Sequence, residues 1–105
     1  MDGFSIALSG LQAASGRTQA TANNIANLQS KGYQATRVGL AEQAQGGVRI
    51  DSVTKDPAPG DPEGSNVDLA QEFTQSNIDG LMYGANLKMI QTQDELLKST
   101  LDLKA

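Results

Sequence analysis

The sequence predicts a mainly α fold, in which an antiparallel, coiled-coil-like pair of long terminal helices flanks a small β-hairpin or irregular insert. Both terminal segments lack proline and carry apolar residues at alternating spacings of four and three, the repeat of a helix that packs on another helix. The prolines and a Gly-Gly pair gather between them, where they favour turns. A chain of 105 residues with two Phe, two Tyr and no Trp has little bulk for a core, so these helices are expected to bury apolar surface by pairing.

An N-terminal helical assembly segment is expected over residues 1–30, with the helix itself at about 4–28. Gly16 costs this helix about 1 kcal/mol relative to alanine, so we expect it to need a partner to stay helical. Its heptad seam is apolar at both ends and small or polar in the middle: Phe4, Leu8, Leu11, Ser15, Thr18, Ala22 and Ile25.

Residues 31–66 are expected to form a short β-hairpin and a Pro/Gly connector. Gly32 suits the left-handed conformation that caps the end of a helix. Alternating apolar stretches within residues 33–40 and 48–54 predict two strands, because Gly46-Gly47 between them permits a turn with positive φ. All three prolines lie in the connector, which is therefore predicted to be irregular or extended.

A C-terminal helical assembly segment is expected over residues 67–105. Ser65-Asn66 offers a capping oxygen, and Asp68 lies near the positive end of the helix dipole. One heptad seam comprises Leu69, Phe73, Ser76, Gly80, Tyr83, Leu87, Ile90, Asp94, Leu97 and Leu101. A second comprises Ile78, Leu81, Met82, Ala85, Met89, Leu96 and Leu103, so the apolar surface is wider than one partner helix requires.

Burying the strongest apolar stripe of each helix against the other removes the most apolar area from water. The residues expected to pair the helices or to assemble the chain with others are therefore Leu8, Leu11, Ile25, Leu81, Leu87, Ile90, Leu97 and Leu101.

The composition argues against most chemistry. With no Cys and no His, the chain has no thiolate or imidazole metal site, no Ser-His or Cys-His nucleophile pair and no histidine general base. The acidic residues at 51, 56, 61 and 63 lack the spacing of a calcium loop and are interpreted as solvated charges. We expect no enzyme activity, catalytic residue, metal, cofactor or small-molecule substrate.

Charge and hydropathy exclude two further classes of partner. Eight Lys and Arg are scattered singly in a chain of net charge -4, which gives no basic stripe to follow a nucleic-acid backbone. No apolar run is long enough for a membrane-spanning helix. The acidic Asp2 stands where a cleaved secretory signal needs positive charge, so no such signal is expected.

Local chemistry alone interprets the Asn-rich stretch at residues 23–27 as capping and turn hydrogen bonding. However, Ser9-Gly10-Leu11-Gln12-Ala13, Asn24-Ile25-Ala26-Asn27 and Ser30-Lys31-Gly32-Tyr33 resemble, in order and spacing, the N-terminal signature of bacterial flagellar axial proteins, the rod and hook family. Ser65-Asn66-Val67-Asp68-Leu69 and residues 89–97 resemble its C-terminal signature. The motif residues carried over are Asn24, Ile25, Ala26, Asn27, Gly32, Tyr33, Asn66, Val67 and Asp68.

This resemblance implies a structural subunit of the flagellar basal-body rod, synthesised in the cytoplasm and exported by the flagellar type III apparatus. Such a subunit polymerises through its terminal helices with itself and with other rod or hook subunits in the periplasm-spanning rod. Ser30 stands where the family usually has Thr, and the insert is much shorter than the β domain of long members, as in proximal-rod subunits. Residues 91–95 look closer to distal-rod and hook proteins, so the position within the rod stays open.

The residues by themselves support only a helix-pairing assembly protein. They leave a second interpretation, a small helical adaptor or regulatory binding module that forms a closed oligomer and binds one partner through its second seam. A fixed oligomer size at all concentrations would favour that interpretation.

Overall fold

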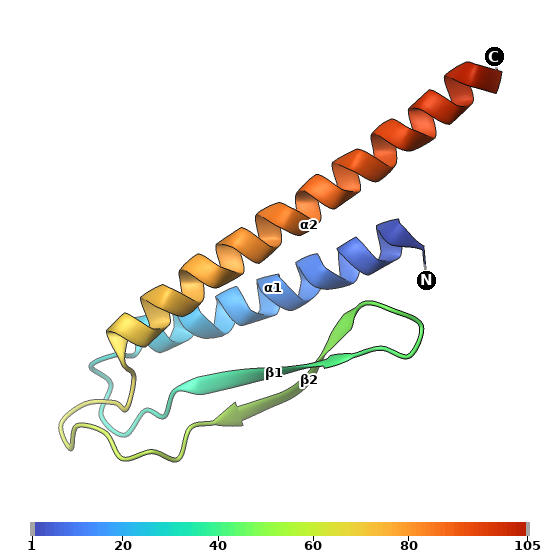
Figure 1. Ribbon diagram of the computed structural model, residues 1–105. Coiled ribbons are helices and arrows are strands. Elements are labelled where there is room, and N and C mark those ends of the chain that lie inside the picture. Colours follow the sequence, from blue (N-terminus) through green and yellow to red (C-terminus); the bar gives the residue numbers. More distant parts are fainter. Residues whose placement is uncertain (1, 105) are drawn as a thin grey trace.

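The computed structural model describes residues 2–104. Its elements are, in order, α1 (Gly3–Ala26), β1 (Thr36–Glu42), β2 (Val48–Lys55) and α2 (Leu69–Lys104). Two long helices with a small antiparallel hairpin between them confirm the predicted mainly α class with a β insert (Figure 1).

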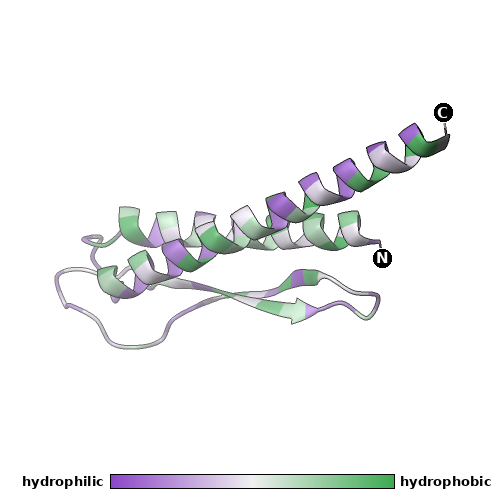
Figure 2. Cartoon of the chain, turned by 45° about the horizontal axis from the view of Figure 1, so that its top comes forward, coloured by the Kyte–Doolittle hydropathy of each residue, from purple (hydrophilic) through white to green (hydrophobic). Residues whose placement is uncertain are grey.

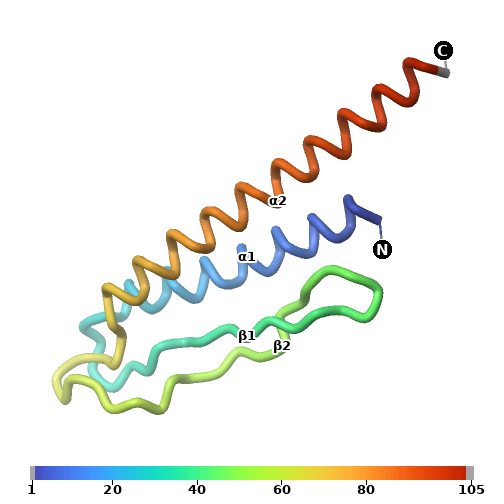
Figure 3. The backbone as a smooth tube through the Cα atoms, in the orientation of Figure 1, coloured from blue at the N-terminus to red at the C-terminus, as the bar shows by residue number. Residues whose placement is uncertain are grey.

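The molecule is long and thin, with extents of 67 × 25 × 14 Å. Helix α1 lies in the middle, since it packs against α2 along one side and against both strands along another (Figure 3). Helix α2 has 36 residues and α1 has 24, so the C-terminal part of α2 projects past the start of α1.

Side chains define both ends of α1. Asp2 is its N-cap, and the Oδ1 atom accepts a 2.7 Å hydrogen bond from the Ser5 N–H, which holds the pKa of Asp2 below its usual range. At the other end, the Asn27 N–H donates to the Asn23 carbonyl and Asn27 Nδ2 donates to the same oxygen at 2.9 Å. The helix is therefore complete at Ala26, two residues earlier than expected.

The expectation that Gly32 caps this helix is wrong in place but right in conformation. Gly32 has φ +77, the left-handed conformation that was predicted, yet it lies in the turn after the helix has ended. Its N–H donates to the Gly64 carbonyl at 2.9 Å, so it ties the start of the insert to the end of the connector.

The hairpin is antiparallel, as predicted, with Gly46 and Gly47 at φ +98 and +83 in the turn. It has a register shift between Gly39 and Leu40. The hairpin is held on α1 by a 3.2 Å hydrogen bond from the Val48 N–H to Ser9 Oγ and by Ile50, which occupies the space that a side chain at Gly16 would fill.

Among residues 2–104 the buried apolar side chains are few, and none of them is large. They are Ala7, Ala13, Ala14, Ala35 and Val67. Large apolar side chains are exposed along both helices, and Figure 2 shows apolar segments distributed along the whole length of each. Within residues 2–104 no helix is long and apolar enough to cross a membrane.

Candidate assembly interface

Helices α1 and α2 meet along a seam of small and polar residues that repeats every seven positions. On α1 the seam runs through Gly3, Gly10, Arg17 and Asn24, and on α2 it runs through Gln93, Asn86, Asp79 and Glu72 in the opposite direction. Each α1 position faces its α2 counterpart in that order, so four polar layers cross the seam at one heptad intervals.

The two layers nearest the chain termini pair a glycine with an amide. A Cβ atom added at Gly10 would lie 2.5 Å from the Asn86 side chain, and one added at Gly3 would lie 2.5 Å from Gln93 Nε2. The Asn86 side chain is short and its Nδ2 donates to the Met82 carbonyl at 2.9 Å, so a larger residue at Gly10 would push the helices apart. At Gly3 the contact is the far end of the flexible Gln93 side chain, which can move aside.

The third layer buries an ion pair. Arg17 Nε lies 3.3 Å from Asp79 Oδ1, which also accepts a 2.9 Å hydrogen bond from Gln75 Nε2. The Asp79 side chain is 0% exposed, and its Oδ2 atom has no hydrogen-bond partner. Arg17 is also the one charged residue in the sequence of α1. A buried carboxylate of this kind is tolerated because its partner is present, since loss of one member of such a pair leaves an uncompensated charge.

The fourth layer is centred on Asn24, which is 1% exposed. Asn24 Nδ2 donates to Glu72 Oε1 and to the Thr36 carbonyl, each at 3.0 Å. Asn24 Oδ1 accepts from the Thr36 N–H at 2.8 Å and from the Tyr33 hydroxyl at 3.2 Å. One amide thus fastens α1 to α2 and to the start of β1.

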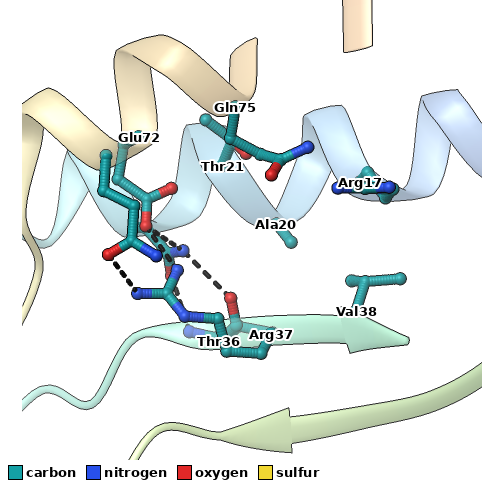
Figure 4. A pocket seen from close by; sticks show the side chains of 10 residues that line it. Arg17, Ala20, Thr21, Thr36, Arg37, Val38, Glu72 and Gln75 are labelled. Carbon is teal, nitrogen blue, oxygen red and sulfur yellow. Dashed lines mark hydrogen bonds and ion pairs between the residues drawn. The ribbon is translucent and has the colours of Figure 1, made fainter. Parts of the chain in front are cut away.

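Glu72 continues this network towards the hairpin. The carboxylate is 1% exposed and lies 2.7 Å from Arg37 Nη1, while Arg37 Nη2 reaches Gln71 Oε1 at 3.4 Å (Figure 4). Arg37 Nη2 also lies 3.5 Å from Asp56 Oδ2. A cavity of about 90 Å³ lies beside this network. We call Asn24, Tyr33, Arg37, Asn66 and Glu72 the polar clasp.

Asn66 connects the segment before β1 to the segment after β2. Its Oδ1 atom accepts from the Ala35 N–H at 2.6 Å, and Nδ2 donates to the carbonyls of Asp56 and Ala58, each at 2.8 Å. Nearby, Ser65 Oγ donates to the Leu28 carbonyl at 2.6 Å. These bonds tie the connector to the end of α1 and to the segment before β1.

The expected cap of α2 needs a correction. Helix α2 begins at Leu69, and Asp68 Oδ1 accepts from the N–H groups of Ala70 and Gln71 at 3.0 and 3.3 Å. Ser65 and Asn66 are the capping residues suggested by the sequence, but Asn66 Oδ1 accepts from the Ala35 N–H and Ser65 Oγ accepts from the Val67 N–H, because these oxygens lie too early in the chain to reach the first helical turn.

The structure therefore gathers part of the predicted motif at one place. Asn24, Tyr33 and Asn66 lie in the clasp, Gly32 bonds across to the connector, and Asn27 ends α1. Val67 is buried, Asp68 caps α2, and Ile25 and Ala26 occupy the last turn of α1.

Sequence reasoning missed the partners Arg17, Arg37, Glu72 and Asp79. The signal available for two of them was a lone charge inside an otherwise uncharged helix and an acid in the opposite helix at the matching heptad position. Pairing of this kind is expected when a charge cannot reach water.

The predicted seam between the helices is displaced by one residue. The expected pairing residues are not brought together, and their exposed fractions include 41% for Leu8, 76% for Leu81 and 61% for Leu97. Leu11, Ile25 and Ile90 are half-buried, whereas Leu87 and Leu101 are exposed. A shift of one residue rotates a helix by about 100°, which turns the apolar stripe away from the seam. The helices pair through the small and polar stripe because its glycines let the helices approach closely and its acidic side chains, Asp79 and Glu72, form ion pairs within the chain.

Both displaced stripes emerge on one side of the helix pair. On antiparallel helices the same one-residue step turns the two stripes towards the same side, and Leu8, Leu11, Ser15 and Tyr83 indeed line one hollow of about 430 Å³. The hairpin lies along the adjoining side of α1, where it contacts Ser9 and borders Leu8 and Gln12 at the edge of this hollow. We call this surface the apolar face; its large residues are Phe4, Leu8, Leu11, Ile25, Leu69, Phe73, Tyr83, Leu87 and Ile90.

An exposed apolar face of this size marks an interaction surface. In contrast, within residues 2–104 no group of three or more His, Cys, Asp or Glu side chains is arranged to hold a metal ion.

Comparisons with known proteins match both halves of the helix pair. A family model described as "Flagella basal body rod protein" matches residues 4–34, and one described as "Flagellar basal body rod FlgEFG protein C-terminal" matches residues 62–103. The chain is 32% identical over 126 aligned positions to the flagellar basal-body rod protein FlgC of Yersinia enterocolitica, across 95% of this chain and 94% of that protein. The matched ranges contain the clasp residues Asn24, Tyr33, Asn66 and Glu72.

Proposed function

The chain belongs to the flagellar basal-body rod protein family and is a structural subunit of the rod, and on this premise we propose that it polymerises through its apolar face. Its neighbours are copies of itself and other rod or hook subunits. The family is structural and not enzymatic, so the surfaces of the chain are interpreted as contacts and not as substrate sites.

One observation carries this proposal. The two helices of a single copy pack against each other through small and polar residues, and their large apolar residues lie on the outside. A chain that functioned as a monomer would be more stable if its helices packed through the large apolar residues, because buried apolar area stabilises by about 25 cal/mol per Å². The arrangement is favourable only when neighbouring subunits cover the apolar face.

The same lack of a large core supports export in an unfolded form through the flagellar type III apparatus. The fully buried apolar residues are four alanines and one valine, so little packing must be broken before the chain can pass through a narrow channel. After export, the subunit takes its place in the periplasm-spanning rod of the basal body. Subunits are added there one by one, and contacts with neighbouring subunits stabilise each of them.

An acidic substitution on the apolar face tests this function. In a strain that lacks the gene, Leu8→Asp and Leu87→Asp should abolish swimming and remove the chain from isolated basal bodies, while export into the medium continues. Val53→Asp, at a 64% exposed position on the hairpin, is the matched control and should swim. Normal swimming with both face variants would contradict the proposal, and so would an equal defect in the control.

A further inference from the structure

We infer that the free end of α2 in one copy docks into the hollow of the apolar face in a second copy. This inference rests on the proposed function and adds to it which segment of the neighbour covers which part of the face. We define the overhang as residues 94–104, which extend beyond the last polar layer at Gly3 and Gln93.

In the part of the chain that the structure describes, the side-chain hydrogen bond and the ion pair of residues 94–103 both lie within the overhang itself. At 1.5 Å per residue it projects roughly 16 Å past the start of α1. Its leucines are among the most exposed apolar residues of the molecule, at 58% for Leu96, 61% for Leu97, 59% for Leu101 and 87% for Leu103. A single copy has nothing with which to cover them.

The overhang is amphipathic. At 100° per residue, the leucines at 96, 97, 101 and 103 fall on one half of the helix, and the charged residues Glu95, Lys98 and Asp102 fall on the other. Lys104, the last residue of the helix, is the charged residue whose position falls on the leucine half. Lys98 pairs with Asp94 at 3.2 Å along the edge between these halves. A helix with one leucine face and one charged face fits an apolar groove whose rim is open to water.

The hollow has matching chemistry. Its lining combines apolar side chains from Leu8, Leu11 and Tyr83 with uncharged polar ones from Gln12, Ser15 and Gln19. No charged residue lines it, so leucine side chains can enter without leaving a charge desolvated. It is an open depression of about 430 Å³, so side chains of a neighbouring copy can reach it directly from outside.

Donor and acceptor are different surfaces of the chain, so the contact runs head to tail. Such a contact does not close on itself and leaves a free overhang and a free hollow at the two ends of every chain of copies, as growth of a polymer requires. Because the centre of the overhang lies near residue 99 and the hollow lies at the level of Tyr83, neighbouring copies would be staggered by roughly 24 Å along the helices.

Engineered cysteines can detect this contact, since the natural chain has no cysteine. Two differently tagged full-length copies are produced together in a strain that lacks the gene, one with Ser15→Cys in the hollow and the other with Thr100→Cys on the leucine half of the overhang. Basal bodies are isolated, oxidised and probed for a mixed disulfide. Ser99→Cys, on the charged half one residue earlier, replaces Thr100→Cys as the matched control.

The inference predicts at least about tenfold more mixed disulfide with Thr100→Cys than with Ser99→Cys, because a disulfide forms only between Cβ atoms about 4 Å apart. Adding Leu101→Asp to the Thr100→Cys copy should remove the signal. The unfolding midpoint of that variant in isolation should stay unchanged, because Leu101 is 59% exposed in a single copy.

Three results would overturn the inference. The first is a dominant disulfide between two Ser15→Cys copies, which would mean that the apolar faces of two copies contact each other. The second is an equal yield of mixed disulfide from the Ser99→Cys control, and the third is no mixed disulfide at all. In each of these the tagged copies are still found in the basal body, so the proposed function stands. If neither copy is present in basal bodies of swimming cells, the proposed function itself fails and this inference with it.

Discussion

At the scale of single residues, Asn24 has the largest structural role in the chain, because its amide bonds to Glu72, Thr36 and Tyr33 from a buried position. Asn24→Ala removes these bonds and leaves the Thr36 N–H and carbonyl without partners. Each unsatisfied buried group costs about 1–3 kcal/mol, so we expect a loss of roughly 2–5 kcal/mol in the free energy of unfolding.

Urea unfolding followed by circular dichroism measures this loss. The control is Asn23→Ala, since Asn23 is exposed and should change stability by less than about 0.5 kcal/mol. Equal midpoints for Asn24→Ala and Asn23→Ala would contradict the role given to Asn24.

The buried pair of Arg17 and Asp79 gives a second prediction. Arg17→Met leaves the Asp79 carboxylate buried and unpaired, which should cost about 3–5 kcal/mol. The double variant Arg17→Met, Asp79→Leu should recover most of that loss, because an apolar layer has no charge to compensate.

A double-mutant cycle of chemical unfolding checks this coupling. The exposed pair Asp94 and Lys98, with side chains 57% and 72% exposed, is the matched control and should show a coupling below about 1 kcal/mol. If the Arg17→Met single variant were as stable as the parent, the pair would not be a buried layer of the seam.

The sequence predicts the roles of some single residues and not those of others. The left-handed Gly32 follows from the lack of a Cβ atom, and the sequence predicts it. The clasp does not follow, because Asn24, Asn66 and Glu72 are far apart in sequence and meet only after the helices and the hairpin are in place. Resemblance to a family marks Asn24 and Asn66 as motif residues, but only the fold assigns their hydrogen bonds.

At the scale of elements, the glycines of the two helices serve opposite purposes. Gly10 faces Asn86 across the seam, whereas a Cβ atom at Gly80 would meet nothing within 4 Å. We therefore expect Gly10→Ala to destabilise the isolated chain. Gly80→Ala should stabilise it by about 0.5–1 kcal/mol, because alanine is the better helix former.

Thermal unfolding of the two alanine variants side by side measures this difference in sign. The account of the seam would be contradicted if Gly10→Ala were stabilising, since that would mean the helices do not approach closely at this layer.

The helices and the hairpin themselves are predictable, because periodicity, turn glycines and prolines are local signals. The choice of seam is not. The strongest apolar stripe, which includes Leu8 and Leu87, predicts the pairing surface of a chain that folds alone. In this chain the stripe one residue earlier, which includes Gly10 and Arg17, forms the pair instead. The periodicity predicts only the apolar stripes, and the small and polar stripe is recognised as the pairing surface only once the two helices are in place.

At the scale of the whole molecule, an elongated shape and a core of small residues predict uneven local stability in a single copy. The leucines of the overhang are exposed in a single copy, whereas residues 72–90 pack on α1 and the clasp. Hydrogen exchange on dilute chain should therefore be fast in the overhang and slower in residues 72–90.

Assembly should then slow exchange in the overhang and on the apolar face. The comparison needs the same peptides from monomer and from isolated basal bodies. Strong protection of the overhang from hydrogen exchange in a proven monomer would contradict the prediction that this segment becomes ordered only through contact with a neighbouring subunit.

The central claim is that one copy pairs its helices through the small and polar seam and keeps the apolar face free. Intrachain disulfides test it most directly, since the parent has no cysteine. A Cβ atom at Gly10 would lie 2.6 Å from Asn86 Cγ, which places the two Cβ atoms within about 4 Å, the separation that a disulfide needs. In oxidised monomer, the account predicts that Gly10→Cys with Asn86→Cys closes an intrachain disulfide and that Leu11→Cys with Leu87→Cys does not. Efficient closure of the Leu11 and Leu87 pair, with none between positions 10 and 86, would place the apolar stripes inside the molecule and contradict the account.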